Sequence, residues 1–262
     1  MADSTKTHIF IPDTQVREGV PLEHLEAAGL YVAEQLPDVL VVAGDWWDMP
    51  SLSTYETKGS KYFHDKSYKK DIVSGNIAMN LFMAPIHREI AKRKKNKKKH
   101  WNPRLVFTVG NHEYRIQRAI NETPILEGTI GYDDFNLLEH GFEIHEYQHV
   151  VEIDGILYSH NFVNQKSLNK NLLGGSMDNR LSKVMRSFTM GHQQVRMWGT
   201  SHDQMGNELC GLVAGAFYQH DEDYAGPQGN HFWRGIVVKH EVENGSYDPM
   251  WVSLDYLLKR YT

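Results

Sequence analysis

Cysteine is nearly absent from this chain, and so are long apolar runs and an excess of positive charge. Cys210 is the only cysteine among 262 residues, so the chain cannot close an internal disulfide or build a thiolate zinc cluster. No run of about 18 apolar residues and no signal-peptide core are present, which predicts a soluble, cytoplasmic protein without a membrane partner. The net charge of -5 excludes an overall basic, nucleic-acid-binding character. Any metal chemistry must rest on Asp, Asn, His and Gln.

Three short apolar segments each end in a cluster of polar residues. They span residues 7–12, 39–43 and 105–109, and they are followed by Asp13, by Gly44-Asp45 and by Gly110-Asn111-His112. A continuous apolar run is typical of a strand that is buried on both faces. Ligands of open α/β sheets bind at the carboxyl ends of the strands, so these polar clusters are predicted to meet in one crevice.

The remaining pattern predicts a two-sheet α/β sandwich with helices outside. Residues 22–36, with Pro21 in the first turn, and residues 69–93, with Ile77 facing inward, have helical periodicity. Residues 172–178 are rich in Gly and Ser and are expected to form a loop. Further strands are expected over 141–153 and 156–159, joined by a turn at Asp154-Gly155, and over 186–190, 210–217, 232–241 and 249–254. No shift in composition marks a boundary, which predicts a single domain over residues 1–262.

Five polar fragments supply the residue types that ligate a divalent metal. Taken singly, Asp13, Asn111 and His160 are ordinary cap, turn or half-buried residues. A divalent ion, however, needs several oxygen or imidazole ligands from different strands, and these fragments lie at or near predicted strand ends. In chain order they are Asp13-Thr14-Gln15, Gly44-Asp45-Trp46-Trp47-Asp48, Gly110-Asn111-His112-Glu113, Ser159-His160 and Gly191-His192-Gln193-Gln194.

The order of these fragments resembles the calcineurin-like metallophosphoesterases, whose pattern is D-x-H, G-D-x-x-D, G-N-H-D/E, H and G-H-x-H. The matching residues lie within 7–194, and the second and third fragments are the most specific. Trp233-Arg234-Gly235 adds a weaker similarity to phosphoesterases of bacteriophages. The resemblance implies a four-layer α/β/β/α metallophosphoesterase sandwich that binds two divalent metal ions.

The resemblance also implies a role for each metal ligand. Asp45 would bridge the two ions, Asn111, His160 and His192 would complete the second metal site, and Asp13 would anchor the first. The pair of ions would lower the pKa of a bridging water, and the resulting hydroxide would attack phosphorus in line with the leaving oxygen.

Three further side chains are implied in catalysis and a fourth in substrate binding. His112 is the expected general acid, and Asp48 would orient its imidazole and favour the protonated form. Arg115, together with Arg118 on the same predicted helix, is a candidate to clamp phosphate oxygens. Surface salt bridges are the alternative role of both arginines.

Gln15 and Gln194 depart from the family pattern, which has histidine at both positions. Amide oxygens are harder and weaker ligands than imidazole, so the first site should prefer Mn or Mg over Zn and should be the weaker site. Three possibilities stay open: the amides bind the ion directly, they bind it through water, or they leave a site that fills only with substrate.

Other residues outside the pattern are candidates for substrate contact. His202 is a reserve ligand or phosphate donor, with a supporting polar role as the alternative, and His231 contacts substrate or is an ordinary surface histidine. Residues 49–68 interleave aromatic rings with lysines, which suits a stacked base or a loop packed on its own domain. Trp46 and Trp47 are expected to wall the pocket.

These features predict a metal-dependent phosphoric ester hydrolase that cleaves a phosphodiester or phosphomonoester in a nucleotide or nucleic acid. Residues 92–99 are Lys or Arg apart from Asn96, which indicates a solvated loop or, in a DNA or RNA nuclease, a contact with the phosphate backbone. A metal-binding scaffold without activity is a different possibility. His112 argues against this possibility, because a protein that only binds metal does not need it.

Overall fold

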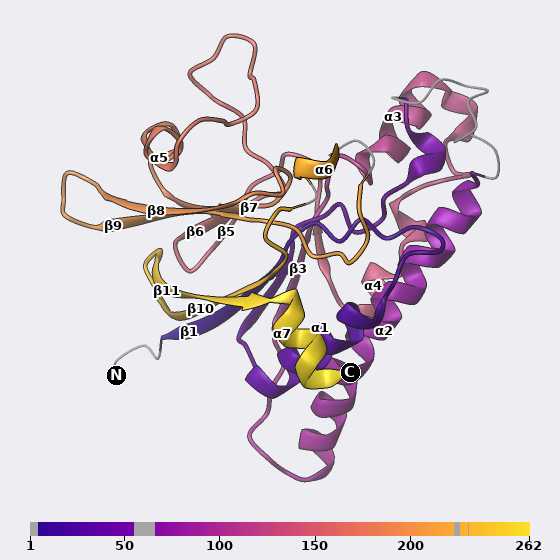
Figure 1. Cartoon of the computed structure of the whole chain (residues 1–262), viewed down its shortest axis with the longest axis horizontal. Coiled ribbons are helices and arrows are strands. Elements are labelled where there is room, and N and C mark those ends of the chain that lie inside the picture. Colours follow the sequence, from indigo (N-terminus) through magenta and orange to yellow (C-terminus); the bar gives the residue numbers. More distant parts are fainter. Residues whose placement is uncertain (1–4, 55–65, 223–225, 230) are drawn as a thin grey trace.

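The computed structural model describes residues 5–54, 66–222, 226–229 and 231–262 of the chain. Within these ranges the protein has a mixed α/β fold with two mixed sheets (Figure 1). Residues 55–65, which carry most of the aromatic rings and lysines predicted to contact substrate, lie outside the described residues. No described helix is both long and apolar enough to cross a membrane.

The first sheet contains the three strands predicted from the apolar segments. Its order is β11-β10-β1-β2-β3-β4; β1 to β4 run parallel, and β10 and β11 are antiparallel additions. All four residues of β2 are buried, as expected of a strand covered on both faces. The strands are β1 (Lys6–Ile11), β2 (Val39–Val42), β3 (Arg104–Thr108), β4 (Glu143–His145), β10 (Gly235–Glu243) and β11 (Ser246–Ser253).

The second sheet has the order β5-β6-β7-β9-β8. Strands β6, β7 and β9 are parallel, while β5 and β8 are antiparallel to their neighbours. The predicted turn between β5 and β6 is confirmed, and both Asp154 and Gly155 have positive φ, as a tight hairpin requires. The strands are β5 (Val151–Ile153), β6 (Ile156–Tyr158), β7 (Ser187–Met190), β8 (Arg196–His202) and β9 (Glu208–Ala214).

Residues 141–153 do not form one strand, contrary to the prediction. The chain turns after β4, where the amide of His149 bonds to the carbonyl of Glu146, and most side chains of 146–150 are exposed. β4 pairs with β3 in the first sheet, whereas β5 pairs with β6 in the second. This segment therefore carries the chain from one sheet to the other.

Helices α1 (Glu23–Gln35), α2 (Tyr68–Lys95) and α7 (Leu254–Tyr261) pack against one face of the first sheet. Their apolar side chains share a core with alternate residues of the strands, such as Ile9 and Leu40. Pro21 lies before α1 rather than in its first turn. Ile77 is 49% exposed, so the inward face of α2 is built from neighbouring residues such as Ala78 and Phe82.

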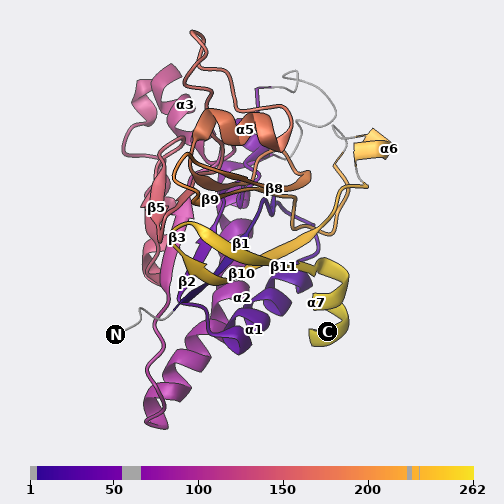
Figure 2. The ribbon, with the colours of Figure 1, turned by 90° about the vertical axis from the view of Figure 1, so that its left-hand side faces the viewer.

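The second core lies between the two sheets, where Phe10 and Val41 of the first sheet meet Ile156 and Leu212 of the second. Helix α5 (Met177–Val184) covers the outer face of the second sheet (Figure 2). It begins within residues 172–178, which were expected to be a loop. The shorter elements are α3 (Tyr114–Glu122), α4 (Leu137–His140), α6 (Gly226–Gly229), η1 (Pro50–Leu52), η2 (Pro124–Leu126) and η3 (Tyr132–Asp134).

Candidate metal centre

The candidate metal ligands follow the carboxyl ends of parallel strands from both sheets. Asp13, Asp45 and Asn111 come after β1, β2 and β3, while His160 and His192 come after β6 and β7. Each loop is short, so each side chain stays close to the end of its strand. The predicted convergence of the five fragments on one edge is thus present in the fold.

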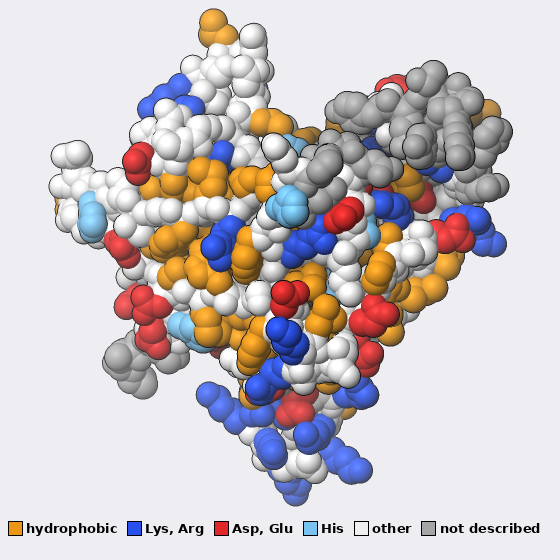
Figure 3. All heavy atoms as spheres, in the orientation of Figure 1, with side chains coloured by type: hydrophobic (Ala, Val, Ile, Leu, Met, Phe, Trp, Pro, Cys, Tyr) orange, Lys and Arg blue, Asp and Glu red, His pale blue; other side chains and the backbone are white. Residues whose placement is uncertain are grey.

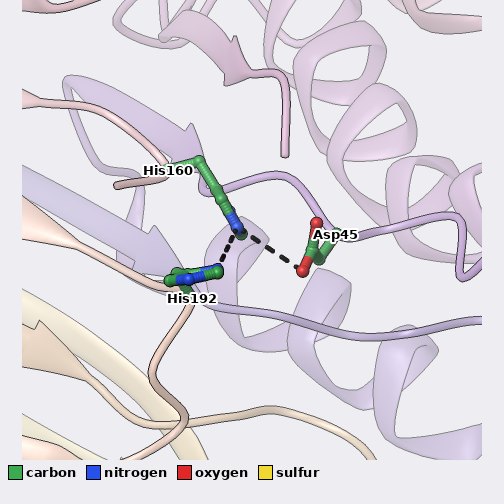
Figure 4. Close-up of side chains that lie close together, drawn as sticks. All are labelled: Asp45, His160 and His192. Carbon is green, nitrogen blue, oxygen red and sulfur yellow. Dashed lines mark hydrogen bonds and ion pairs between the residues drawn. The ribbon is translucent and has the colours of Figure 1, made fainter. Parts of the chain in front are cut away.

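Four potential ligand atoms lie within a few ångströms of one another. His160 Nε2 is 3.0 Å from Asn111 Oδ1, 3.2 Å from His192 Nδ1 and 3.4 Å from Asp45 Oδ2. His192 Nδ1 is 2.8 Å from the same Asn111 oxygen. Figure 4 shows Asp45, His160 and His192 directed toward one another, and these three residues could hold a metal ion.

The imidazole of His160 has a fixed orientation. Its Nδ1 is 2.7 Å from the carbonyl oxygen of Ala43 and therefore carries the proton, which leaves a lone pair on Nε2. Burial lowers the pKa of His160 to about 4, despite the charge of Asp45, so the ring is neutral at physiological pH. A neutral imidazole with its lone pair directed at other acceptors is the arrangement that a cation stabilises.

The buried carboxylate of Asp13 is a second group that a bound cation would stabilise. Its side chain is fully buried, and Oδ1 accepts the backbone N–H of His192 at 2.9 Å. Oδ2 is buried and has no hydrogen-bond partner among the described residues. Burial, and then the charge of Asp45, raise the pKa of Asp13 well above its usual value. Buried carboxylates are normally paired or bound to a metal, so this oxygen fits a ligand of the first ion.

Gln15 lies two residues after Asp13 in the sequence and Gln194 lies two residues after His192, and both glutamines are buried. The amides of Thr14 and Gln15 bond to the carbonyl of Asp45, which joins the first two loops. The side-chain oxygen of Gln194 accepts a 2.8 Å hydrogen bond from the Tyr218 hydroxyl. Gln194 is therefore positioned by the segment after β9, a contact that the sequence did not indicate.

Four motif residues have left-handed backbone conformations, which non-glycine residues rarely adopt. Their φ angles are 45° for Gln15, 47° for Asp45, 67° for His192 and 55° for Gln194. Such a conformation costs about 1–3 kcal/mol per residue and is concentrated at functional sites. Nine described non-glycine residues outside the five fragments also have positive φ, so the conformation marks tight turns elsewhere as well as this site.

Two motif glycines are required by close packing against carboxylates. A Cβ atom on Gly110 would lie 2.1 Å from Asp45 Oδ1, and one on Gly191 would lie 2.3 Å from Asp13 Oδ1. Both distances are far below van der Waals contact. These glycines let the loops that carry Asn111 and His192 approach the metal ligands.

Glu113 has a structural role that sequence reasoning missed, although it belongs to the third fragment. Its buried carboxylate accepts four backbone N–H groups, from Asp45, Trp46, Trp47 and Gly110, at 2.6–3.0 Å. It thereby joins the loop after β2 to the loop after β3. Burial and the charge of Asp45 raise the pKa of Glu113 to about 7, against the opposing effect of these N–H groups. The charge of a bound cation would offset the repulsion between the carboxylates of Glu113 and Asp45.

His112 and Asp48 form the predicted pair. His112 Nδ1 is 2.8 Å from Asp48 Oδ1, and its Nε2 lies 3.7 Å from Asp45 Oδ2. Burial alone would favour a neutral ring, but the charge of Asp45 and the hydrogen bond to Asp48 outweigh it and raise the pKa of His112 to about 9. Correspondingly, His112 lowers the pKa of Asp48 to about 2 in spite of burial.

Arg115 lies beside the site, but both of its terminal nitrogens, Nη1 and Nη2, already contact other residues of the protein. Its Nη1 bonds to the carbonyls of Asp48 and Met49, and its Nη2 is 3.2 Å from His112 Nε2. Arg115 therefore supports the loop after β2 and lies beside His112. Arg118 bonds to the carbonyl of Leu52 and lies 4.0 Å from a carboxylate oxygen of Glu122.

His202 is not brought to this centre. β8 is antiparallel to β9, so it starts at the edge that carries the site and runs away from it. His202 is its last residue, about 20 Å of extended chain from Arg196, and it is exposed. His231 is exposed, and its amide bonds to the carbonyl of Gln228 next to α6.

Trp46 and Trp47 were expected to wall the pocket, but they do not. Both side chains are fully buried in the core between the first sheet and α2. Trp46 donates to the carbonyl of Gly75, and Trp47 stacks on Phe135 with ring centroids 4.1 Å apart. These rings fasten α2 to the loop that carries Asp45.

No protein-family model matches the chain, and no curated protein matches it.

Proposed function

We propose that the protein is a metal-dependent phosphoric ester hydrolase of the calcineurin-like kind. The observation that carries this proposal is the group of ligand atoms from Asp45, Asn111, His160 and His192, next to the unpartnered Asp13 oxygen. Oxygen and imidazole groups of the kind that ligate divalent metals are gathered there, and a cation would stabilise the buried Asp13 oxygen that has no hydrogen-bond partner among the described residues.

The arrangement of the elements supports the same proposal. Helices α1, α2 and α7 cover one sheet, the second sheet packs against the first, and α5 covers the outside of the second. We take this as the four-layer α/β/β/α sandwich of the calcineurin-like phosphoesterases, with the site at the carboxyl ends of the parallel strands.

Two divalent ions, Mn or Mg rather than Zn, would supply the charge that stabilises the phosphoryl transition state and lowers the pKa of a coordinated water. Asp45, Asn111, His160 and His192 would hold one ion. Asp13 would hold the other with Asp45, and the amide oxygens of Gln15 and Gln194 make that side weaker. His112, directed by Asp48, would protonate the leaving oxygen through Nε2.

Among substrates, nucleotide-type phosphate esters are favoured over long nucleic acid. The basic run 92–99 begins at the C-terminal end of α2, whereas the N-terminal end of that helix is near the site, where Asp71 accepts the amide of Ser51. From Asp71 to Lys95 the helix spans about 36 Å. Figure 3 shows Lys and Arg side chains gathered at the lower end of the molecule, over this end of α2. The basic run is therefore too far from the site to contact the phosphate that is cleaved, so it gives no support to a nuclease.

Hydrolysis of nitrophenyl phosphodiesters and phosphomonoesters tests the proposal directly. Turnover should appear with Mn or Mg, disappear with a chelator and be lost in Asp45→Asn. The matched control is Asp248→Asn on the exposed face of β11, which should keep full activity. If wild-type protein binds metal and hydrolyses neither type of ester under any condition, the hydrolase proposal is wrong and a metal-binding scaffold is favoured.

A further inference from the structure

Arg17 lies between two carboxylates that come from distant parts of the chain. Its Nη1 is 3.1 Å from Asp48 Oδ2, in the loop after β2, and 2.6 Å from Glu222 Oε1, in the segment after β9. His220 Nε2 contacts the same Glu222 oxygen at 2.7 Å. One guanidinium nitrogen thus joins the loop after β2 to a segment about 170 residues later in the sequence.

These ion pairs are largely shielded from water. The side chains of Glu222 and Asp48 are 7% and 13% exposed, and that of Arg17 is 27% exposed. The two carboxylates outweigh the effect of burial and raise the pKa of Arg17 above its already high value, so its charge is permanent. Partly buried pairs are screened less than surface pairs, and removing one partner leaves a carboxylate with an unmet charge.

The two oxygens of Asp48 are divided between two partners. Oδ1 contacts His112 Nδ1 at 2.8 Å, and Oδ2 is the oxygen that Arg17 holds. The rotation of the Asp48 carboxylate is therefore set by a contact on the side away from the histidine. This carboxylate holds the His112 imidazole together with the backbone carbonyl of Asp48, which lies 2.8 Å from the same Nδ1. Without Arg17 the carboxylate could rotate toward solvent or toward other donors.

We propose that Arg17 is a positioning residue for His112, acting through Asp48 and anchored in turn by Glu222 and His220. The proposal rests on the function proposed above. It assigns to the segment after β9, which also contacts Gln194 through Tyr218, the further task of holding the general acid in place. Arg17 itself makes no contact with the candidate ligand atoms that the described residues present.

A positioning role predicts a loss that depends on the leaving group. Protonation matters little for nitrophenolate, a good leaving group, and matters greatly for an alkoxide. Arg17→Met should therefore lower kcat about tenfold or more on alkyl phosphate esters and less than about twofold on nitrophenyl esters, with KM and bound metal unchanged. Arg17→Lys should recover part of the loss, because it keeps the charge without the planar fork.

Glu222→Gln should produce the same selective loss to a smaller degree, because it removes the charge that anchors Arg17 and keeps the side-chain shape. The double variant of Arg17→Met with Glu222→Gln should be no worse than Arg17→Met alone, since both act through one contact. The matched control is Arg186→Met, which removes an exposed 2.7 Å pair with Glu152 and should have no effect on turnover.

A spectroscopic readout separates this inference from the proposed activity. The proton on His112 Nδ1, which bonds to Asp48, should give a downfield NMR signal that broadens or shifts in Arg17→Met and persists in Arg186→Met. A wild-type protein without turnover would refute the hydrolase, and this signal would still test the positioning. An unchanged signal in Arg17→Met, or an equal loss of kcat on all leaving groups, would refute the role of Arg17.

Discussion

The four hydrogen bonds to Glu113 allow a quantitative prediction for Glu113→Gln. The two carboxylate oxygens each accept two backbone N–H groups: Trp46 and Trp47 bond to Oε1, while Asp45 and Gly110 bond to Oε2. Glutamine can offer its oxygen to one of these pairs, and its NH2 group must then face the other. Two buried donors lose their acceptor whichever way the amide is turned.

Leaving a buried donor unpaired costs about 1–3 kcal/mol, so Glu113→Gln should lower the free energy of unfolding by about 2–6 kcal/mol. That is a large part of the stability of an ordinary domain. The same change loosens the loops that carry Asp45 and Asn111, so metal affinity should fall as well. Urea unfolding with and without Mn measures both effects.

Glu143→Gln is the matched control, because Glu143 is 48% exposed and forms a bidentate surface pair with Arg104. Loss of this pair should lower the free energy of unfolding by less than about 1 kcal/mol. If Glu113→Gln stays within about 0.5 kcal/mol of wild type, the carboxyl group must already be protonated, and the reasoning from four accepted N–H groups is refuted.

Three further predictions concern the acid, the first metal and acid stability. His112→Ala should retain bound metal and lose about 10²–10⁴-fold in turnover of esters with poor leaving groups; full activity there would exclude its acid role. Replacing both Gln15 and Gln194 by histidine should tighten the second equivalent of metal in calorimetry, and an unchanged titration would mean that neither position touches an ion. His8 is fully buried, and burial lowers its pKa to about 4 from 6.5. The unfolded chain binds more protons between these values, so stability is complete above about pH 6.5 and falls toward pH 4, by about 3 kcal/mol for this group. A His8→Gln variant should flatten that dependence in urea unfolding, and an equally steep curve would contradict the assignment.

The strand ends and most candidate ligands could be predicted from the sequence because both are local patterns. An apolar run that ends in Gly-Asp or Gly-Asn-His specifies a buried strand and the loop that follows it. Convergence then follows from the geometry of parallel strands. His202 shows the limit of this reasoning: the pattern identified a strand near it, but strand direction depends on pairing with β9, which no local signal reveals.

Contacts between distant loops could not be predicted, since they depend on the complete fold. Glu113 accepts hydrogen bonds from backbone N–H groups of a loop that lies almost seventy residues earlier in the sequence. Arg17 and Glu222 meet only because the segment after β9 returns to the first sheet, where Ala216 forms a bridge with Asp13. Gln194 could be recognised as a departure from the family pattern, whereas its partner Tyr218 could not be identified.

Anomalous diffraction from a crystal grown with Mn tests the central claim most directly, because it locates the ion without relying on any substrate. A manganese peak is expected between Asp45, His160 and His192, in contact with Asn111, with a second, weaker peak beside Asp13. Manganese bound elsewhere, with no peak among these side chains at saturating concentration, would contradict it.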